Sequence, residues 1–461
     1  MLRGSQAGPQ RLAGTLRMRR ARGCSAQIGR ARMVDQPEPR LAARSRAVTL
    51  RAVAPSIFVP ALVYEIGNGA IAPIVALTAL DLGASPSRAG FMLALLGIGQ
   101  VLGDIPSSSL AERIGDRHAM IVAAGCDVAA LFGCLVARSL WVFGVALLVV
   151  GMSNGTFYLA RQSYLTDVMP AGMRARAMST LGGSHRIGLF VGPLVGASVI
   201  GLTNMRGAYV VAMITATATA ALLIAIPDVP VPISDDVALP VSNGATQVSR
   251  AGVSGYRMFR TYRRLFATLG VAVLAVGAVR AVRQTAVPLW AEHIGLGPEQ
   301  TSIIFGIASA VDMALFYPAG KVMDHLGRLA IAVPSMVILG VATMLLPLAS
   351  GPLALAVFAI AMSFGNGLGS GIMMTLGADV APANSRIKFL SVWRVMSDAG
   401  NAAGPLVVSI VASALTLAAG IAATGFIGVL AAVGLARWAP KYSAYATRKM
   451  VRDQRDNEVI A

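Results

Sequence analysis

The sequence predicts an all-α integral membrane protein with twelve transmembrane helices in two six-helix repeats, related by a pseudo-two-fold axis along the membrane normal. Three observations predict this fold: an apolar composition, twelve long apolar runs, and a duplication at one fixed offset. The 461-residue chain is 56% hydrophobic and only 13% charged, about half the charged fraction of a soluble protein. Helices packed in lipid accommodate this composition, whereas several soluble domains do not.

The apolar runs are long enough to cross a bilayer as helices. They cover residues 57–80, 89–110, 119–137, 140–165, 178–202, 208–226, 265–290, 301–320, 329–349, 352–378, 389–414 and 418–436. The longest polar interruption separates the first six runs from the last six. We therefore expect a basic N-terminal tail (1–52), a six-helix half (53–226), a cytoplasmic linker (227–264), a second half (265–436) and a basic C-terminal tail (437–461).

The positive charges indicate an orientation. Of the 39 Lys and Arg residues, 31 fall in the segments that twelve spans place on one side, three in the opposite loops and five inside spans. The positive-inside rule puts the richer side, with both termini, in the cytoplasm. The net charge of +18 therefore reports topology, and nucleic acid need not be invoked as a partner.

The two halves are predicted to be duplicates, because adding 212 to a first-half position repeatedly reaches the same or a similar residue. Matches of Asp, Asn, Pro and Arg at one ungapped offset are rare by chance. The pairs include Pro86 with Pro298, Glu112 with Asp324, Gly115 with Gly327, Asn154 with Asn366, Asp167 with Asp379, Arg174 with Arg386 and Pro193 with Pro405. Six spans per half is an even number, so both halves enter the membrane from the same side, and a transport pathway is expected at their interface.

Two loops lie at corresponding positions: one carries a motif of glycine, acid, glycine and arginine, and the other carries part of it. The motif residues are Gly320, Asp324, Gly327 and Arg328 after the eighth span, and Glu112, Arg113 and Gly115 after the second. The first glycine lets neighbouring helices touch, the second permits a tight turn, and the arginine offsets helix-end carbonyl dipoles.

This spacing resembles the signature loop of the major facilitator superfamily, and with the duplicated halves and central linker the resemblance covers about residues 55–440. The second copy matches well. The first departs from the pattern at Ser108, Glu112 and Asp116. The resemblance implies a transporter in which two six-helix halves rock about a central site.

The fifth span carries three glycines on a four-residue spacing, Gly188, Gly192 and Gly196, and a helix-bending Pro193 directly after the second of them. They resemble the motif of the family's exporters, chiefly drug:proton antiporters. An ordinary seam of close helix packing is the other interpretation. The stretch from Phe143 to Val150 in the fourth span lacks the arginine that the family's antiporters place there.

Other energy sources and metal chemistry find no support in the sequence. The chain lacks a Gly-x-x-x-x-Gly-Lys-Ser/Thr phosphate loop, so an ion gradient or the substrate's own gradient is expected to drive transport. No cofactor or metal site is predicted, because the few cysteines and histidines are scattered: Cys24, Cys126, Cys134, His118, His185, His293 and His325.

Ten charged residues fall inside the predicted spans, where each is expected to pair or to face water. They are Glu65, Asp104, Asp127, Asp312, Asp398, Arg161, Arg186, Arg280, Arg283 and Arg394. Matching depths, with the helix neighbours that the resemblance implies, suggest the pairs Arg186–Asp312 and Asp104–Arg394, which would close the cytoplasmic side. Static packing pairs, or a local Arg394–Asp398 pair, are the alternatives.

Glu65 is the first candidate for proton coupling, with Asp104 second. Desolvation favours the neutral form of a carboxylic acid, which a reversible proton carrier needs. The alternative is that Glu65 is a structural partner of a nearby arginine. Tyr64 and Asn68 lie beside it and are predicted to line the central cavity.

Arg280 and Arg283 share a face of the seventh span, which lines the cavity in the family. They suggest either an anionic group on the substrate or neutralisation of Glu65. Arg161 is expected to reach the membrane surface with its long side chain.

The predicted function is proton-coupled efflux of a small, amphiphilic molecule from the cell by a monomer in the cell membrane. Proton symport of an anionic metabolite into the cell is the alternative. Two other classes receive less support: a membrane enzyme would need clustered catalytic residues, and a sensor or scaffold would not need to transport.

Overall fold

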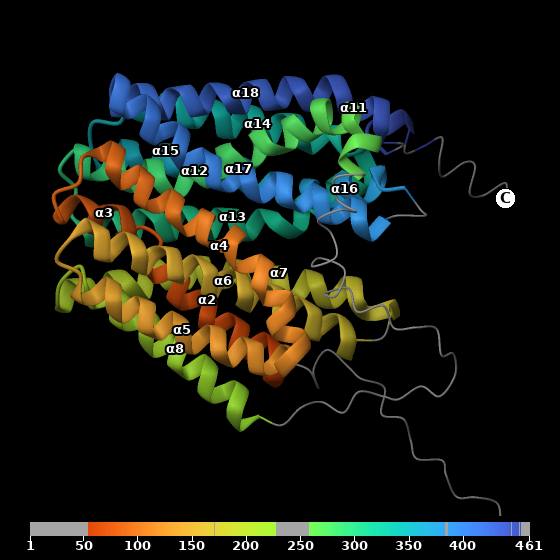
Figure 1. Ribbon diagram of the computed structural model, residues 1–461. Coiled ribbons are helices and arrows are strands. Elements are labelled where there is room, and N and C mark those ends of the chain that lie inside the picture. The colour runs from red at the N-terminus through yellow and green to blue at the C-terminus, as the bar shows by residue number, and fades with distance from the viewer. Residues whose placement is uncertain are drawn as a thin grey trace, which may run out of the picture. The chain divides into compact units, whose positions relative to one another are not determined.

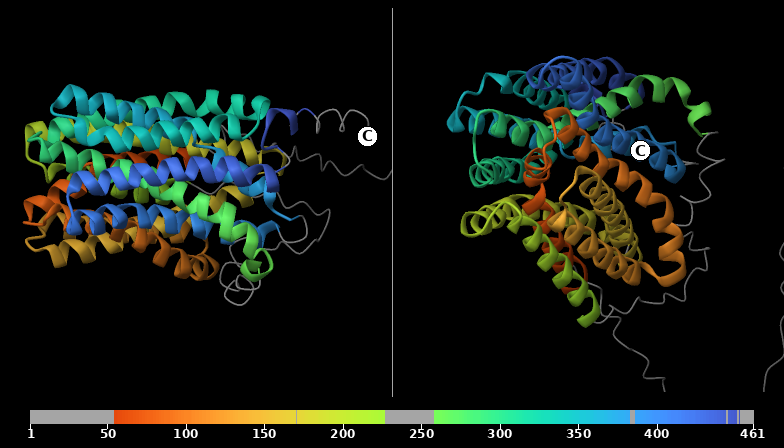
Figure 2. Two further views of the ribbon diagram at one scale, coloured as in Figure 1. Left: turned by 90° about the horizontal axis from the view of Figure 1, so that it is seen from above. Right: turned by 60° about the vertical axis from the view of Figure 1, so that its left-hand side comes forward.

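A computed structural model describes residues 54–169, 171–226, 258–382, 386–443, 445–450 and 452. These residues form helices and short turns without a strand in any of those ranges. The predicted N-terminal tail and most of the linker lie outside them. The helices run roughly parallel from one end of the bundle to the other (Figures 1 and 2).

The first half begins with a π-helical turn, Ala54–Phe58. Its helices are α2 (Val59–Ile71), α3 (Ile74–Asp81), α4 (Pro86–Ile114), α5 (Asp116–Val136), α6 (Leu140–Val168), α7 (Ala171–Leu202) and α8 (Gly207–Ala225).

The second half begins with α11 (Arg263–Leu265) and a π-helical turn, Phe266–Gly270. It continues with α12 (Val271–His293), α13 (Pro298–Leu326), α14 (Leu329–Leu345), a 3-10 turn (Leu346–Leu348), α15 (Pro352–Leu368), α16 (Ile372–Val380), α17 (Arg386–Ala414) and α18 (Leu417–Tyr442).

The expected duplication is visible in the packing. In the first half α2 packs on α7, α4 on α6 and α5 on α8; in the second half α12 packs on α17, α13 on α15 and α14 on α18. The turn glycines repeat too, because the residues with positive φ are Gly83 and Gly115 in one half and Gly295 and Gly327 at the equivalent positions of the other. Each permits a turn that a side chain would strain. The halves meet where α7 contacts α13 and α4 contacts α17.

Every predicted span coincides with one helix or with two consecutive helices, and several helices extend beyond the predicted apolar runs. Eleven helical segments among the described residues are long and apolar enough to cross a membrane, and α4, 29 residues long, completes the set of twelve. Polar turns extend α4, α7, α13 and α18 beyond the apolar runs, so α18 occupies part of the predicted C-terminal tail. Hydropathy marks the lipid boundary, whereas helix ends depend on caps such as Ser85, Ser139 and Thr416.

Two predicted spans are broken in the middle. The first is interrupted at Ala72 and Pro73, because Pro73 has no amide hydrogen to continue the helix. The tenth is interrupted between α15 and α16, in the run Gly369-Ser370-Gly371. Discontinuous membrane helices commonly form the binding site of a transporter, because their free backbone groups and turns face a cavity.

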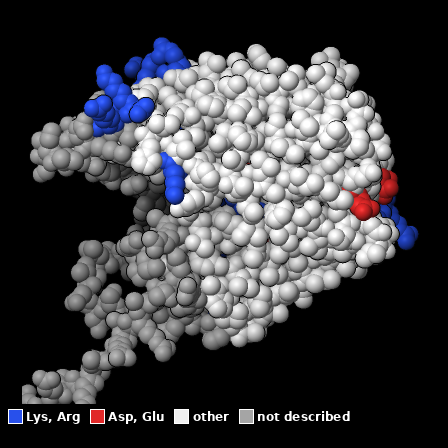
Figure 3. All heavy atoms as spheres, turned by 180° about the vertical axis from the view of Figure 1, so that it is seen from behind, with Lys and Arg blue, Asp and Glu red and all other residues white. Residues whose placement is uncertain are grey.

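The surface agrees with a membrane setting. In the view of Figure 3 a broad face carries almost no charged side chains, and Lys and Arg gather near one end of the bundle. We call this end, where α18 finishes at Tyr442, the terminal end. The other end, which carries the turns capped by Ser85, Ser139 and Thr416, is the opposite end.

Candidate functional site

A cavity of about 800 Å³ lies between the two halves. Both broken helices contribute to it, through Ile71 and Val75 on one side and Asn366 and Ser370 on the other. Its other polar lining residues include Asn68, Asn154, Tyr158, His185, Arg186, Arg280, Arg283, Asp312, Arg394 and Asp398. The predicted cavity residues Asn68, Arg280 and Arg283 therefore line it, whereas Tyr64 lies behind the wall, where it stacks on Phe157.

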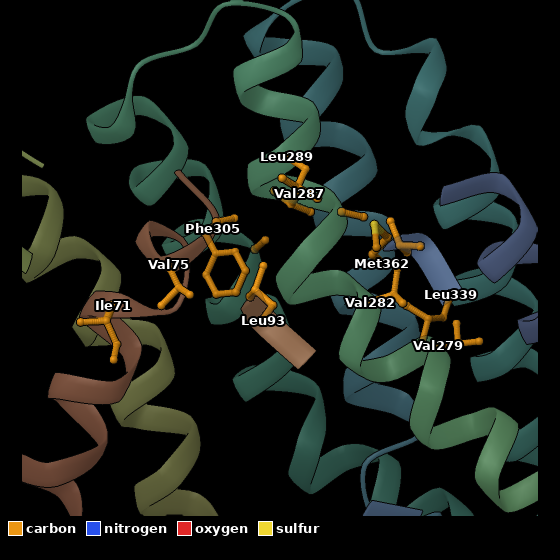
Figure 4. Close-up of a cluster of buried hydrophobic side chains, with 14 of the residues drawn as sticks. Ile71, Val75, Leu93, Val279, Val282, Val287, Leu289, Phe305, Leu339 and Met362 are labelled. Atoms are coloured by element: carbon orange, nitrogen blue, oxygen red, sulfur yellow. The ribbon is translucent and has the colours of Figure 1, made fainter. Parts of the chain in front are cut away.

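The cavity is closed at the opposite end. Ser87 of α4 and Ser409 of α17 each donate a hydroxyl hydrogen bond to the other's carbonyl oxygen, at 2.8 and 2.7 Å. An apolar cluster lies nearby (Figure 4). It is formed by Val75 of α3, Leu93 of α4 and Phe305 of α13. Toward the terminal end the lining residue Met374 is 74% exposed. The cavity therefore has an exposed lining residue on its terminal side, in contrast to its closed opposite end.

Glu65 lies at the centre of a buried polar cluster in the first half. Its side chain is fully buried, yet Arg161 Nη1 lies 3.0 Å from Oε1 and His185 Nδ1 lies 2.9 Å from Oε2. Tyr158 donates a hydrogen bond to Oε2 at 3.1 Å. The prediction that Arg161 reaches the membrane surface was wrong: its side chain is 9% exposed, because the ion pair with Glu65 compensates its burial.

A hydrogen-bond network continues from this cluster. Asn68 donates to both Tyr158 and Asn154, and Tyr64 donates to Asn154 at 2.7 Å. Sequence reasoning missed Tyr158, and it noticed Asn154 only as half of a repeat pair. Its partner in that pair, Asn366, also lines the cavity, so a polar residue repeated inside both apolar spans was a usable signal.

The glycines of the fifth span form a packing seam that holds Glu65 in place. A Cβ on Gly188 would lie 2.3 Å from the Glu65 Cβ, and one on Gly192 would lie 2.4 Å from the Ile66 carbonyl oxygen. A Cβ on Gly196 would lie 3.2 Å from the Ala70 carbonyl oxygen. The helix α7 continues through Pro193. The seam therefore presses α7 directly against α2 at the Glu65 position.

We expect Gly188→Ala to destabilise the protein, because the added methyl must displace α2 or α7, and overpacking costs ~1–3 kcal/mol. Gly183→Ala on the same helix is the matched control, since its Cβ would meet nothing within 4 Å. Thermal unfolding of the two purified variants checks this. Equal melting temperatures would contradict the seam.

The second half carries a charged cluster that reaches across the interface. Arg186 of α7 forms the predicted pair with Asp312 of α13, Nη1 to Oδ2, at 2.8 Å. Asn366 donates to the other Asp312 oxygen at 3.0 Å and accepts from Arg280 Nε at 2.8 Å. Arg283 donates to Ser363 at 3.0 Å. The Asp312 carboxylate therefore binds one residue from each half, Arg186 and Asn366.

The structure does not form the predicted Asp104–Arg394 pair. Arg394 instead bonds Gln162 of α6 at 3.0 Å and pairs with Asp398 on its own helix at 3.4 Å. Asp104 Oδ1 has no hydrogen-bond partner and points toward Gly155 of α6. The Asp104–Arg394 prediction was therefore wrong, and the local Arg394–Asp398 pair, the alternative left open by the sequence, is the one formed.

The two signature loops differ. In the second, Arg328 pairs with Asp379 of α16 at 2.9 Å, and its amide bonds Tyr445. In the first, Glu112 and Arg113 are exposed. The side chain of Asp324 lies outside the described part of the chain. Gly320 does not provide the expected close contact, because a Cβ there would meet nothing within 4 Å.

The comparisons with known proteins agree with this architecture. The family model described as Major Facilitator Superfamily matches residues 57–282 and 269–454. The chain belongs to the major facilitator superfamily. It is therefore a multi-pass membrane protein of a transporter superfamily.

Curated proteins and solved structures are also similar to this chain. Multidrug resistance protein MdtG of Klebsiella pneumoniae is 28% identical over 160 residues, 34% of this chain and 39% of that relative. The match thus spans about two fifths of the curated relative. Two solved structures share the fold. A POT family transporter in complex with a thioalcohol-conjugated peptide has a TM-score of 0.65 and 12% sequence identity, and the match covers 85% of this chain and 96% of that one. A D-xylose–proton symporter has a TM-score of 0.61 and 16% sequence identity, and the match covers 84% of this chain and 97% of that one.

Proposed function

We propose that this transporter exports a small amphiphilic molecule in exchange for protons, by alternating access, with both termini in the cytoplasm. The similarity to MdtG proteins supports export, and the excess of Lys and Arg at the terminal end supports this orientation. The observation that carries proton coupling is the Glu65–His185 contact of 2.9 Å.

Glu65 and His185 together suit proton exchange. The His185 side chain is 41% exposed and lines the cavity, whereas the Glu65 carboxylate is fully buried. An imidazole can bind a proton at one ring nitrogen and release one from the other, so His185 can pass a proton between the cavity and the buried acid. Other charged and titratable groups at Glu65 are Arg161 and Tyr158 of α6.

Protonation of Glu65 would remove the charge that binds α6 and α7 to α2. Arg161 and His185 would then lose an ionic partner, and the contact of α2 with α7 at Gly188 would transmit the change to the helix that carries Arg186. Arg186 in turn pairs across the interface with Asp312. Protonation of Glu65 and the contact between the two halves are thus coupled through one helix, α7.

Everted membrane vesicles test this proposal. A panel of cationic, neutral and anionic antibacterial compounds is first screened for protection of cells that overproduce the protein. For a protective compound, its addition to energised vesicles should release protons from the lumen in wild type. The alternative, proton symport of an anionic metabolite, predicts that compound and protons move in the same direction, and that result would refute export.

A further inference from the structure

Positive charge exceeds negative charge in the part of the cavity between α7, α12 and α13. Arg186, Arg280 and Arg283 line this region together with Asp312. Asp312 pairs with Arg186 at 2.8 Å and accepts a hydrogen bond from Asn366 at 3.0 Å. Three guanidinium groups thus share a single carboxylate among the described lining residues of this region.

The remaining acids of the site are committed elsewhere. Glu65 is bound by Arg161 and His185 in the first half. Asp398 pairs with Arg394 on α17. The second-half arginines therefore do not neutralise Glu65, which was one of the two interpretations left open by the sequence.

Among the described residues, the hydrogen-bond acceptors of Arg280 and Arg283 are neutral oxygen atoms. Arg280 donates to the Asn366 amide oxygen at 2.8 Å and to the Gly369 carbonyl at 3.4 Å. Arg283 donates to Ser363 and stacks over Phe305, and its buried Nε has no hydrogen-bond partner. Because these contacts fix the orientation of both side chains without cancelling their charge, the site is prepared for an anion.

Apolar walls adjoin these arginines. Phe305, which lies under Arg283, belongs to the apolar cluster with Val75 and Leu93 at the closed end of the cavity (Figure 4). A ligand that places an anionic group at Arg280 can therefore rest an apolar body against this cluster. A cation at the same place would meet repulsion from all three arginines.

We infer that the substrate is an amphiphilic oxyanion, whose carboxylate, sulfonate or phosphonate group binds Arg280 with support from Arg283. Arg280 is the direct contact because it is partly exposed in the cavity, whereas Arg283 is 3% exposed. The planar guanidinium fork matches two oxygen atoms of such a group. This inference rests on the proposed transport function for its substrate role, but the site itself is tested by binding alone.

The test uses the full chain in lipid nanodiscs at one pH, with no gradient. Three probes of similar size are compared by calorimetry: benzenesulfonate, trimethylphenylammonium and benzyl alcohol. Benzenesulfonate should bind at least about 10-fold more tightly than the cation or the alcohol, since a charge-assisted pair is available to the anion alone. Equal binding of the three probes, or no binding of benzenesulfonate, would overturn the inference.

Variants locate the site. Arg280→Gln should weaken benzenesulfonate binding by about 10-fold or more, and Arg280→Lys should retain part of it because it keeps the charge. Arg88→Gln is the matched control, because Arg88 is exposed and does not line the cavity. Unchanged binding in Arg280→Gln would overturn the assignment, and the wild-type selectivity remains decisive if that variant fails to fold.

The outcomes separate this inference from the proposed export. Selective binding of benzenesulfonate without proton exchange in vesicles would leave the anion site standing and refute proton-coupled export. Export of cationic compounds, with no benzenesulfonate binding, would leave export standing and refute the anion site.

Discussion

Replacing Glu65 by Gln should reduce proton-driven transport to the level of vesicles that lack the protein. Glutamine keeps the shape, but it replaces one acceptor oxygen by a donor NH2 group and cannot take up and release a proton. The same change leaves Arg161 buried without its ionic partner, and removing one member of a buried pair costs ~3–5 kcal/mol. We therefore expect a lower melting temperature as well as lost coupling.

A double variant separates these two effects. Glu65→Gln with Arg161→Gln removes both charges, so it should recover much of the stability while transport remains uncoupled. Glu112→Gln, an exposed acid in the first signature loop, is the control and should preserve both properties. If the double variant recovers proton-driven transport, Glu65 is a structural partner of Arg161 and not the proton carrier.

Exchanging Arg186 and Asp312 has the second largest expected effect. Each single reversal, Arg186→Asp or Asp312→Arg, places two like charges about 3 Å apart at the interface of the halves. Like charges at this distance in a partly dehydrated site repel strongly, so each should abolish transport. The double variant restores opposite charges and should recover a substantial fraction, measured as initial export rate.

The local pair on α17 provides the comparison. Arg394 and Asp398 lie one turn apart on a single helix, so their exchange keeps the pair within one half. The exchange also removes the Arg394–Gln162 hydrogen bond to α6, so we expect a partial loss of transport that is smaller than the loss in the single reversals of Arg186 and Asp312. If the Arg186–Asp312 double variant stays inactive while its surface expression and stability are normal, the pair does not act as a reversible cross-link between the halves.

The outcomes for the pairs Arg186–Asp312 and Asp104–Arg394 show that the depth of a residue along its span is not enough to predict its ionic partner. Depth follows from counting residues along a span, and it placed both pairs at matching levels. Direction about the helix axis depends on how neighbouring helices pack, and Gly155 lets α4 and α6 approach closely where Asp104 turns inward. Only the first pair therefore formed.

For Glu65, too, the sequence predicted the position along the span, and helix packing decided the partners. The sequence indicated an acid within the first span and left open whether a proton or an arginine was its partner. The structure adds three partners from two other helices, Arg161, Tyr158 and His185. Residues about 90 to 120 positions away in the chain could not be assigned to it by local pattern.

The sequence by itself determined the membrane setting, the number of spans, the duplication and the small-residue seam on α7. These are one-dimensional properties, because apolar length and a repeated offset can be read without knowing which helices touch. Only the tertiary structure decided which charges pair, where α2–α3 and α15–α16 break, and that Arg280 and Arg283 lie beside the Arg186–Asp312 pair while bonding to neutral oxygen atoms. The physical reason is that burial and charge pairing depend on contacts between distant helices, whose rotation the close packing of both halves sets.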